Sequence, residues 1–579
     1  MGAIGVVAVT AAGRAVGERL RAVWPDEVEV VTADRPAEAL QRAFRDSDAV
    51  VAFVAVGATV RVLAPLIGDK TTDPPVVCVD EALRYAVPVL GGHYGANTLA
   101  HRLSKTLGCT AVVTTASDSV AATPLDSYGA DLGCSVADPA PLARVGARLL
   151  SGEPVRLEGT REWPLPPLPP NAAPEVTEPG AAVIRVDDRT DTVVTASADT
   201  LVYRPPSLVV GVGAARGVSA AEVTELIEAA LTDAALAGAS VRCVATVDLK
   251  ADESGIVEAA RQRGWRLRAF PAADLAAIDV PHPSELVRSE VGTPSVAEAA
   301  ALHAAALDGR SAELVVAKRK SPNATVAVAR LRPRGRLCVV GLGPGARDLT
   351  APRALAQLRR ASVVVGLDQY IDQIRDLLAP GTQVVASGLG QEEERARTAV
   401  EQARAGAAVA LIGSGDAGVY AMASPALDAA GTDIDVVGVP GITAAVAAAH
   451  LLGAPLGHDH AYISLSDLHT PWEAIERRVR AAAEGDFTVC FYNPRSRNRD
   501  WQFPRALELL AAHRPPETPV GHVRNAARDG ERVTVTTLAD MLDGGAAEVD
   551  MYTVVVVGST ASRIVAGRFV TPRGYRWKE

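Results

Sequence analysis

The chain of 579 residues is poor in aromatic side chains, at 4%, and in cysteine, of which it has six. The cysteines are scattered and form no C-x-x-C pair, so neither a disulfide framework nor a thiolate zinc site is expected. A basic excess is missing too, since the formal net charge is −10. This charge argues against general nucleic-acid binding, which needs a cationic surface. A local arginine cluster can still bind a small anionic substrate.

Long hydrophobic runs are also missing. The longest charge-free run, 436–457, contains five helix-breaking or turn-forming residues, Gly438, Pro440, Gly441, Gly453 and Pro455. It therefore predicts a strand, a turn and a buried helix rather than a membrane span. The first cationic residue, Arg14, follows the first apolar stretch instead of preceding it, which is not the pattern of a signal peptide. We expect a soluble, cytoplasmic protein that binds neither membranes nor nucleic acid.

The composition that is present is globular. Hydrophobic residues make up 48% of the chain and charged residues 22%, and the length exceeds what one hydrophobic core can hold. Alanine, valine and glycine dominate, and short apolar runs alternate with helical patterns. We therefore predict a multidomain α/β protein with parallel or mixed sheets.

The organisation along the chain follows from the same patterns. We expect a first α/β unit over 1–120, with strands at 4–9, 49–56 and 76–79. Residues 121–205 look irregular and include a stiff proline-rich linker at 163–170. A second unit follows over 206–332, where Ser219 and Glu222 predict a capping box that opens a helix to about residue 236. The last unit covers 337–575.

Four turns in the last unit each follow a short apolar run. The runs 337–340, 408–412, 434–439 and 487–491 lead into Gly341–Gly345, Gly413–Gly418, Pro440–Thr443 and Tyr492–Arg495. A glycine turn at the end of a buried strand lets a ligand approach the backbone closely, so the four turns predict one small-molecule pocket.

The residues of these turns argue against a nucleotide-binding site. The turn at 341–345 spells G-x-G-x-G, but Ala346 replaces the third glycine position of a dinucleotide fingerprint and no G-K-[ST] follows. In the turn at 211–217, Arg216 occupies the place of the third glycine. Neither turn therefore predicts a dinucleotide or a nucleoside triphosphate.

A resemblance to a known family becomes specific at these turns. Val-Val-Gly-Leu-Gly-Pro-Gly at 339–345 and Ser-Gly-Asp-Ala-Gly-Val-Tyr-Ala-Met at 414–422 resemble the tetrapyrrole methyltransferases of cobalamin biosynthesis. Within them, Val-Pro-Gly-Ile-Thr-Ala-Ala at 439–445, Ile-Ser-Leu-Ser-Asp-Leu at 463–468 and Phe-Tyr-Asn-Pro-Arg-Ser at 491–496 are similar to precorrin-3B C-17-methyltransferase. The chain departs from the usual pattern by Ala417 for proline and Leu367 for tyrosine.

The resemblance implies a methyltransferase fold in which S-adenosylmethionine binds between subdomains at about 337–455 and 456–575. The residues that would line the cofactor site are Pro344, Gly415, Asp416, Val419, Tyr420, Thr443, Ala444, Tyr492, Asn493, Ala526 and Thr553. Asp416 offers a carboxylate to a cationic ligand, and capping of its own turn is the alternative. A homodimer through this half stays open.

The family reaction is methyl transfer to C-17 of a precorrin with contraction of the macrocycle. Positioning dominates the methyl transfer, whereas the contraction needs proton transfers. The candidates for these are Ser464, Ser466, Asp467, His458 and His460, and helix capping is the alternative for the Ser-Leu-Ser-Asp segment. Arg495 and Arg524 suit the carboxylate side arms of the substrate, with surface ion pairs as the alternative. Methylation at another tetrapyrrole position is a rival function.

The N-terminal half resembles a different family, the cobalt-precorrin-5A hydrolases. The motifs lie at 57–61, 64–65, 69–74, 79–81, 92–97, 248–250, 292–298 and 318–325. That family opens a lactone on the corrin precursor and releases acetaldehyde. Here Gly-Ala-Ala-Arg-Gly at 213–217 replaces a Gly-Cys-Arg-Arg-Gly-like turn, so a non-catalytic corrinoid-binding module is the alternative.

Lactone hydrolysis requires a polarised carbonyl and an activated water. His93, Glu298, Lys318 and Lys320 have suitable side chains, although the sequence does not place them together. No H-x-x-H or C-x-x-C spacing predicts a metal site in the protein, so cobalt would enter only within the precorrin or cobalt-precorrin substrate.

Overall fold

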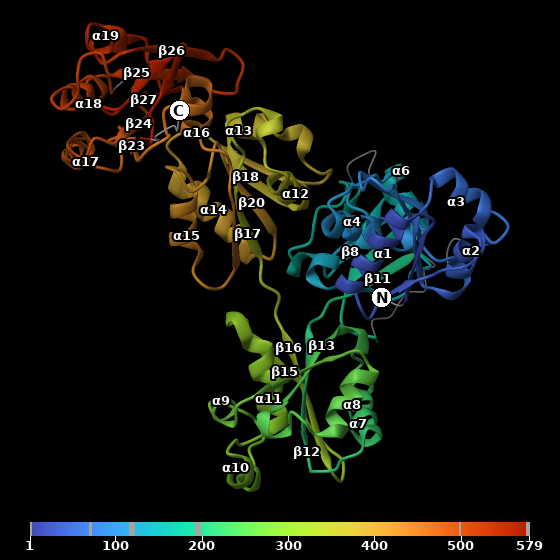
Figure 1. Ribbon diagram of the computed structural model, residues 1–579. Helices are drawn as coiled ribbons and strands as arrows, with labels where there is room; N and C mark the ends of the chain where they lie inside the picture. The colour runs from blue at the N-terminus through green and yellow to red at the C-terminus, as the bar shows by residue number, and fades with distance from the viewer. Residues whose placement is uncertain (1–2, 69–71, 115–121, 191–198, 497–498, 575–579) are drawn as a thin grey trace. The chain divides into compact units, whose positions relative to one another are not determined.

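The computed structural model describes residues 3–68, 72–114, 122–190, 199–496 and 499–574 (Figure 1). The chain forms two compact units. The N-terminal unit is Met1–Pro333 with Ala379–Gly381, and the C-terminal unit is Arg334–Leu378 with Thr382–Glu579. Within the described ranges, no helix is both long enough and apolar enough to cross a bilayer. The predicted multidomain α/β class is confirmed.

The first sheet of the N-terminal unit has the order β2-β1-β3-β4-β5-β6 and is parallel except between β4 and β5. Its strands are β1 (Ile4–Ala8), β2 (Val28–Val30), β3 (Ala49–Phe53), β4 (Val76–Val79), β5 (Tyr85–Leu90) and β6 (Thr110–Ala111). Its helices are α1 (Ala11–Val23), α2 (Pro36–Asp46), α3 (Val56–Leu63) and α4 (Ala96–Leu107). The predicted strand at 49–56 is too long, because α3 already starts at Val56. An apolar run rich in valine does not by itself distinguish strand from helix.

A second sheet lies where the sequence looks irregular. Its order is β7-β11-β10-β8-β9, with β7 (Ser135–Val136), β8 (Val155–Glu158), β9 (Ala172–Ala173), β10 (Ala182–Val186), β11 (Thr200–Arg204) and the helix α6 (Leu142–Ser151). The proline-rich segment is not a free linker, because Leu165 and Leu168 pack into the core of this sheet. The strands are too short, at two to five residues, to show a clear alternation in the sequence.

The third sheet has the order β14-β13-β12-β16-β15. Its strands are β12 (Leu208–Ala214), β13 (Val241–Val247), β14 (Arg266–Phe270), β15 (Ala312–Lys320) and β16 (Ala324–Leu331). Its helices are α7 (Ala220–Asp233), α8 (Ser254–Gln262), α9 (Ala272–Ala276), α10 (Glu285–Val291) and α11 (Val296–Ala306). The predicted capping box of α7 is half formed: the Ser219 side chain accepts a hydrogen bond from the Glu222 N–H, but the Glu222 carboxylate accepts from Ser321 and Asn323 instead of from Ser219.

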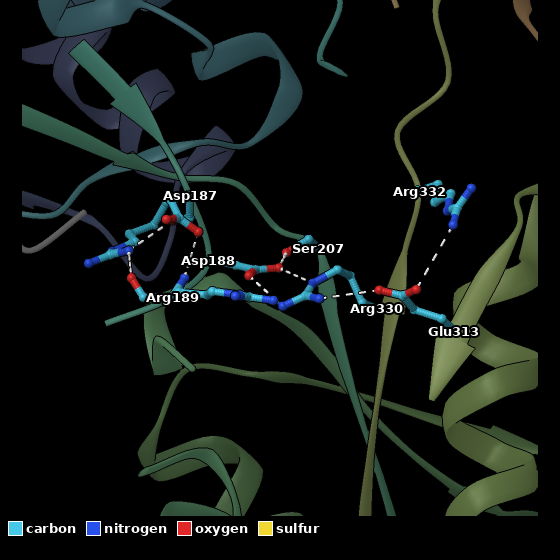
Figure 2. A network of polar contacts seen from close by, with 8 residues as sticks. Asp187, Asp188, Arg189, Ser207, Glu313, Arg330 and Arg332 are labelled. Carbon is cyan, nitrogen blue, oxygen red and sulfur yellow. Dashed lines mark hydrogen bonds and ion pairs between the residues drawn. The ribbon is translucent and has the colours of Figure 1, made fainter. Parts of the chain in front are cut away.

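A network of polar side chains joins the segment after β10 to Ser207, just before β12, and to strands β15 and β16 (Figure 2). Arg330 donates two hydrogen bonds to the Asp188 carboxylate, at 2.7 and 2.8 Å, and a third to Glu313 at 3.2 Å. The Ser207 hydroxyl donates to Asp188 at 2.5 Å. The hydrogen bonds to Asp188 raise the pKa of Arg330 above its usual range. Because Asp188 is buried, the pair links these segments through charges that water screens only weakly.

The C-terminal unit contains a parallel sheet of order β19-β18-β20-β17-β21. Its strands are β17 (Arg336–Gly341), β18 (Val363–Leu367), β19 (Gln383–Ser387), β20 (Ala408–Gly413) and β21 (Asp435–Val439). The helices α12 (Pro352–Arg360), α13 (Asp368–Asp372), α14 (Glu392–Arg404) and α15 (Ala423–Ala430) cover this sheet (Figure 1). The predicted strands before the first three glycine turns are confirmed to within two residues.

A second sheet follows in the same unit, with the order β23-β24-β27-β25-β26. It consists of β23 (His460–Ser464), β24 (Thr488–Tyr492), β25 (Pro519–Arg524), β26 (Arg532–Thr537) and β27 (Thr553–Val557). Its helices are α16 (Ala444–Leu452), α17 (Trp472–Glu484), α18 (Gln502–Ala511) and α19 (Leu538–Leu542). A small sheet is formed by β22 (Gly453–Ala454), β28 (Arg563–Val565) and β29 (Arg568–Val570). The run 436–457 forms the predicted strand, turn and buried helix.

The six cysteines are free thiols, and all but Cys134 are buried. Burial raises the pKa of Cys134 to about 11 and that of Cys490 to about 12. Burial also raises the pKa values of Cys78, Cys109 and Cys243. Thiols of this kind carry little of the reactive thiolate at neutral pH.

We predict that acid weakens the second sheet of the C-terminal unit through His522. This side chain is buried in β25, and burial lowers its pKa below 6.5, with Glu548 acting weakly in the opposite direction. The unfolded chain therefore binds the proton first, and stability is lost as pH falls below about 6.5, by at most about 1.4 kcal/mol per pH unit. Hydrogen exchange of β25 between pH 7.5 and 5.5 measures this slope. His522→Gln should flatten it, and an unchanged slope would contradict the assignment.

Candidate functional site

Three glycine turns of the C-terminal unit meet backbone to backbone. Because β17, β20 and β21 are parallel neighbours, their carboxyl ends lie at one edge of the sheet. Gly343 and Gly415 exchange two backbone hydrogen bonds, at 3.0 and 2.8 Å. A Cβ added at Gly341 would lie 2.7 Å from the Gly415 carbonyl oxygen, and one at Gly441 only 2.1 Å from it. This close approach requires glycine at both positions.

The Asp416 carboxylate links two of these turns by hydrogen bonds. Its Oδ1 accepts the Gly418 N–H at 2.8 Å and its Oδ2 accepts the Gly441 N–H at 3.0 Å. Asp416 therefore caps its own turn, which is the alternative that the sequence left open to a contact with the cofactor. Ala417, the departure from the family pattern, is buried in the core beside Met422.

The turns border a cavity of about 330 Å³ in the C-terminal unit. Every predicted cofactor residue except Asp416 lines it, namely Pro344, Gly415, Val419, Tyr420, Thr443, Ala444, Tyr492, Asn493, Ala526 and Thr553. Both sheets of the unit contribute, since the first four follow β17 and β20 and Tyr492 ends β24. The structure thus brings together residues that are more than 200 positions apart in the sequence.

Aromatic side chains form one wall of the cavity. The rings of Tyr420 and Tyr492 line the cavity with their centres 5.4 Å apart, and the ring of Tyr462 packs behind them, 5.8 Å from Tyr492. The Tyr492 hydroxyl is 2.6 Å from the Thr443 hydroxyl and accepts the Ala445 N–H at 3.0 Å. Burial raises the pKa of Tyr492 to about 12, so its hydroxyl stays protonated at neutral pH. The wall is therefore aromatic and uncharged, with its rings tilted by 55° against each other.

The backbone around the cavity is strained. Tyr420, Asn493 and Asn525 line the cavity with φ values of 51°, 49° and 51°, in the left-handed region that side chains other than glycine rarely adopt. Such residues cost about 1–3 kcal/mol each and cluster at functional sites. Their position supports a functional role for this cavity over a packing defect.

Two arginines at the cavity were missed by the sequence analysis. Arg528 donates to the Pro344 carbonyl oxygen at 2.5 Å and to the Ser414 hydroxyl at 2.6 Å, so it connects the two sheets of the unit. Arg395 is buried and donates to Ser387 and to the Gly388 carbonyl oxygen. Neither arginine belongs to a glycine turn, so no local pattern marks it.

The predicted proton-transfer residues are only partly near the cavity. The Ser464 hydroxyl accepts a hydrogen bond from the cavity residue Asn493 at 3.2 Å and one from the Ser466 N–H at 3.3 Å. Asp467 instead accepts from Gln502 at 2.8 Å. The helix-cap alternative for this segment is wrong, because the next helix, α17, begins only at Trp472.

The predicted histidines and substrate arginines lie outside the lining of this cavity. His458 accepts the Asp459 N–H, and His460 contacts the His458 carbonyl oxygen. Arg495 donates to the carbonyl oxygens of Ala546 and Ala547. Arg524 pairs with Asp550 at 2.8 Å, which is the ion-pair alternative of the sequence analysis.

The residues predicted to hydrolyse a lactone in the N-terminal unit do not all lie together. His93 lies in a short 3-10 helix, η1 (Gly92–Tyr94), and its side chain is outside what the structure describes, as are residues 69–71 of the 69–74 motif. Glu298 and Lys318 lie together, because the Lys318 N–H donates to Glu298 at 3.0 Å. A third residue, His282, joins them and was missed, since only its Pro-His-Pro context sets it apart in the sequence.

Lys320 is exposed. Within the described part of the chain, no group of three or more His, Cys, Asp or Glu side chains is arranged to hold a metal ion.

Comparison with known proteins defines the class of the C-terminal unit. Residues 336–542 match the model of the tetrapyrrole (corrin/porphyrin) methylases. A probable cobalt-factor III C(17)-methyltransferase of Salmonella typhimurium is 46% identical over 242 residues, which are 41% of this chain and 99% of that protein. The chain therefore belongs to the tetrapyrrole methylase family.

Further relatives agree. A precorrin-3B C(17)-methyltransferase of Sinorhizobium is 40% identical over 40% of this chain and 91% of its own length. A cobalt-factor III methyltransferase of Priestia megaterium is 42% identical over 42% of this chain, and the match spans only 46% of that longer protein.

The N-terminal unit matches two other family models. Residues 38–118 match the cobalamin synthesis G N-terminal model, and residues 208–329 match the cobalamin synthesis G C-terminus model. The protein is thus a fusion of cobalamin synthesis G regions with a tetrapyrrole methylase. Both resemblances in the sequence are confirmed.

Proposed function

We propose that the protein is a bifunctional enzyme of cobalamin biosynthesis. Its C-terminal unit transfers a methyl group from S-adenosylmethionine to C-17 of a precorrin-3 type tetrapyrrole, with ring contraction. Its N-terminal unit opens a precorrin lactone and releases acetaldehyde. The main support is that one cavity gathers nearly all the residues that family resemblance assigns to the methyl donor, in a unit 46% identical to a C(17)-methyltransferase over almost its whole length.

The cavity suits the methyl donor, which supplies an electrophilic methyl group on a sulfonium. Because Gly341, Gly415 and Gly441 carry no Cβ, the three turns that border the cavity can pack backbone against backbone. Tyr420 and Tyr492 line the cavity with aromatic rings, whose faces attract cations. The described residues thus bind and orient, which is what an in-line methyl transfer requires.

Ser464 has a role in the proton transfers of ring contraction. It is connected to the cavity through Asn493, whereas Asp467, His458 and His460 have other contacts. The hydroxyl both donates and accepts, so it can pass a proton without carrying charge. We propose Ser464 as the leading candidate of the predicted set.

The lesser expectations from the sequence belong to the same proposal. The enzyme acts in the cytoplasm, binds no metal ion of its own, and pairs through the methyltransferase half. The domain limits remain 1–120, 121–205, 206–332 and 337–575. Light scattering of the full chain tests the pairing, and metal analysis of the purified protein tests the metal.

The proposed methyltransferase activity is tested by finding which carbon of the product is methylated. The full chain is incubated with methyl-labelled S-adenosylmethionine and a precorrin-3 type substrate, with and without cobalt, and the product is examined by mass spectrometry and NMR. We expect the label on C-17 of a contracted ring. Label on another carbon would favour the rival methyltransferase function.

Trapping of acetaldehyde from a lactone substrate tests the second activity, and tight pigment binding without aldehyde would favour the binding-module alternative.

A further inference from the structure

A buried carboxylate holds an exposed imidazole in the N-terminal unit. Glu298, the third residue of α11, is completely buried, whereas the His282 side chain is 56% exposed. The Glu298 Oε1 lies 2.8 Å from the His282 Nδ1, and its Oε2 accepts the His282 backbone N–H at 3.2 Å. An ionised carboxylate only accepts hydrogen bonds, so Nδ1 carries the proton and the lone pair of the neutral ring is on Nε2. The buried group thus fixes both the tautomer and the direction of the ring.

The backbone on both sides supports this arrangement. The Lys318 N–H of the edge strand β15 also donates to Glu298, at 3.0 Å. The Ser284 N–H donates to the Pro294 carbonyl oxygen at 2.8 Å, which ties the His282 segment to the entrance of α11. Prolines 281 and 283 restrict the backbone on either side of the histidine. The imidazole is therefore presented by a rigid segment.

Positive charge lies beside the imidazole. The Lys318 ammonium donates to the His282 carbonyl oxygen at 2.6 Å, which uses one of its three protons and leaves two. Lys320, two residues further along β15, is exposed and adds a second positive charge to this end of the strand. Arg319 points to the other face and pairs with Asp233. A base beside an ammonium group suits a substrate that carries carboxylates.

A purely structural role explains less of this geometry. A buried glutamate that only fastened two backbone N–H groups would need no ring nitrogen, and a ring that only packed would not be more than half exposed. The pattern of a buried acid, an oriented histidine and an open second nitrogen is that of a general base.

We propose that His282 is the general base that activates water in lactone opening, that Glu298 positions it, and that Lys318 binds a carboxylate arm of the macrocycle. This inference rests on the proposed lactone hydrolysis. Nε2 takes a proton from water as the water oxygen bonds to the lactone carbonyl carbon. The ring C–O bond then breaks, and the departing oxygen takes the proton from the imidazolium. A carboxylic acid and a hydroxyl group result. The hydroxyl group then becomes the carbonyl of acetaldehyde as the C–C bond between its carbon and the macrocycle breaks, and the hydroxyl proton ends on the macrocycle carbon, so no oxidant or reductant is consumed.

The test measures acetaldehyde release by the full chain from a lactone substrate. His282→Asn keeps an N–H for Glu298 but removes the base, and we expect the rate to fall about 100-fold or more. His101→Asn, at an exposed site on α4, is the matched control and should leave the rate unchanged. Lys318→Gln should raise KM and leave kcat nearly unchanged. Added imidazole should restore part of the rate of His282→Ala, which a structural role would not allow.

The outcomes separate this inference from the function on which it rests. If the unaltered chain releases no acetaldehyde, the proposed hydrolysis fails. If the unaltered chain is active and His282→Asn is equally active, the role of His282 is overturned.

If the variants misfold, modification of the unaltered protein with diethylpyrocarbonate tests the role of His282. Loss of activity should then follow modification of His282, mapped by mass spectrometry, and hydroxylamine should reverse it. Full modification of His282 with retained activity would overturn the proposal.

Discussion

Gly441→Ala is expected to weaken binding of S-adenosylhomocysteine at least 100-fold. A Cβ at this position would lie 2.1 Å from the Gly415 carbonyl oxygen and 2.8 Å from the Gly341 carbonyl group. All of these atoms are backbone, so no side-chain rotation relieves the clash, and the turns that border the cavity must separate. A 100-fold loss corresponds to about 2.7 kcal/mol, which is within the usual cost of overpacking. Titration calorimetry of the full chain gives the affinity.

The chain offers a matched control on β21, the strand that leads into this turn. Gly438 lies three residues earlier on β21, and a Cβ added there meets nothing within 4 Å. Gly438→Ala should therefore bind the ligand as the unaltered protein does. Equal affinities for the two variants would show that the contact of the three turns does not shape the binding site.

Arg330→Leu should destabilise the N-terminal unit by about 3 kcal/mol. The substitution removes both hydrogen bonds from the guanidinium to Asp188, whose side chain is only 8% exposed, and leaves that carboxylate with Ser207. Breaking a buried pair by removing one partner is costly because the other charge stays buried. Hydrogen exchange in β12 and β16 reports the local loss, and β20 of the other unit should be unaffected.

Two further variants test the cause. Arg332→Leu removes a side chain that is 72% exposed and 4.0 Å from Glu313, so its effect should be within about 0.5 kcal/mol. Replacing both Arg330 and Asp188 by leucine should recover much of the loss, since no unpaired charge remains. If Arg330→Leu and Arg332→Leu cost the same, burial of the pair is not what stabilises this junction.

The fold was predictable where sequence signals are local. The buried parallel strands β17 and β20 are apolar over nearly their whole length, and each ends in a glycine turn, so both are evident in the sequence. The sheet within 121–205 was missed because its strands are short and separated by turns. The segment with Leu165 and Leu168 has the composition of a linker, yet packs as core.

The site residues were likewise predictable only where a local motif contains them. Pro344, Gly415 and Thr443 lie in turns with a family pattern, so resemblance could assign them. Arg528 and His282 have partners outside their own segments: Pro344 lies 184 residues from Arg528, and Glu298, in helix α11, lies 16 residues from His282. Such pairs arise from tertiary structure, and no spacing within one sequence reveals them.

The inert thiols make the protein a convenient scaffold for optical probes. Since burial raises the pKa of five of the six native cysteines, these thiols should react slowly with maleimides at neutral pH. A cysteine introduced for the exposed Tyr552, at the rim of the cavity, would then accept a fluorophore selectively. Ligand entry could be followed in real time by fluorescence emission, in the 579-residue chain with its native thiols intact.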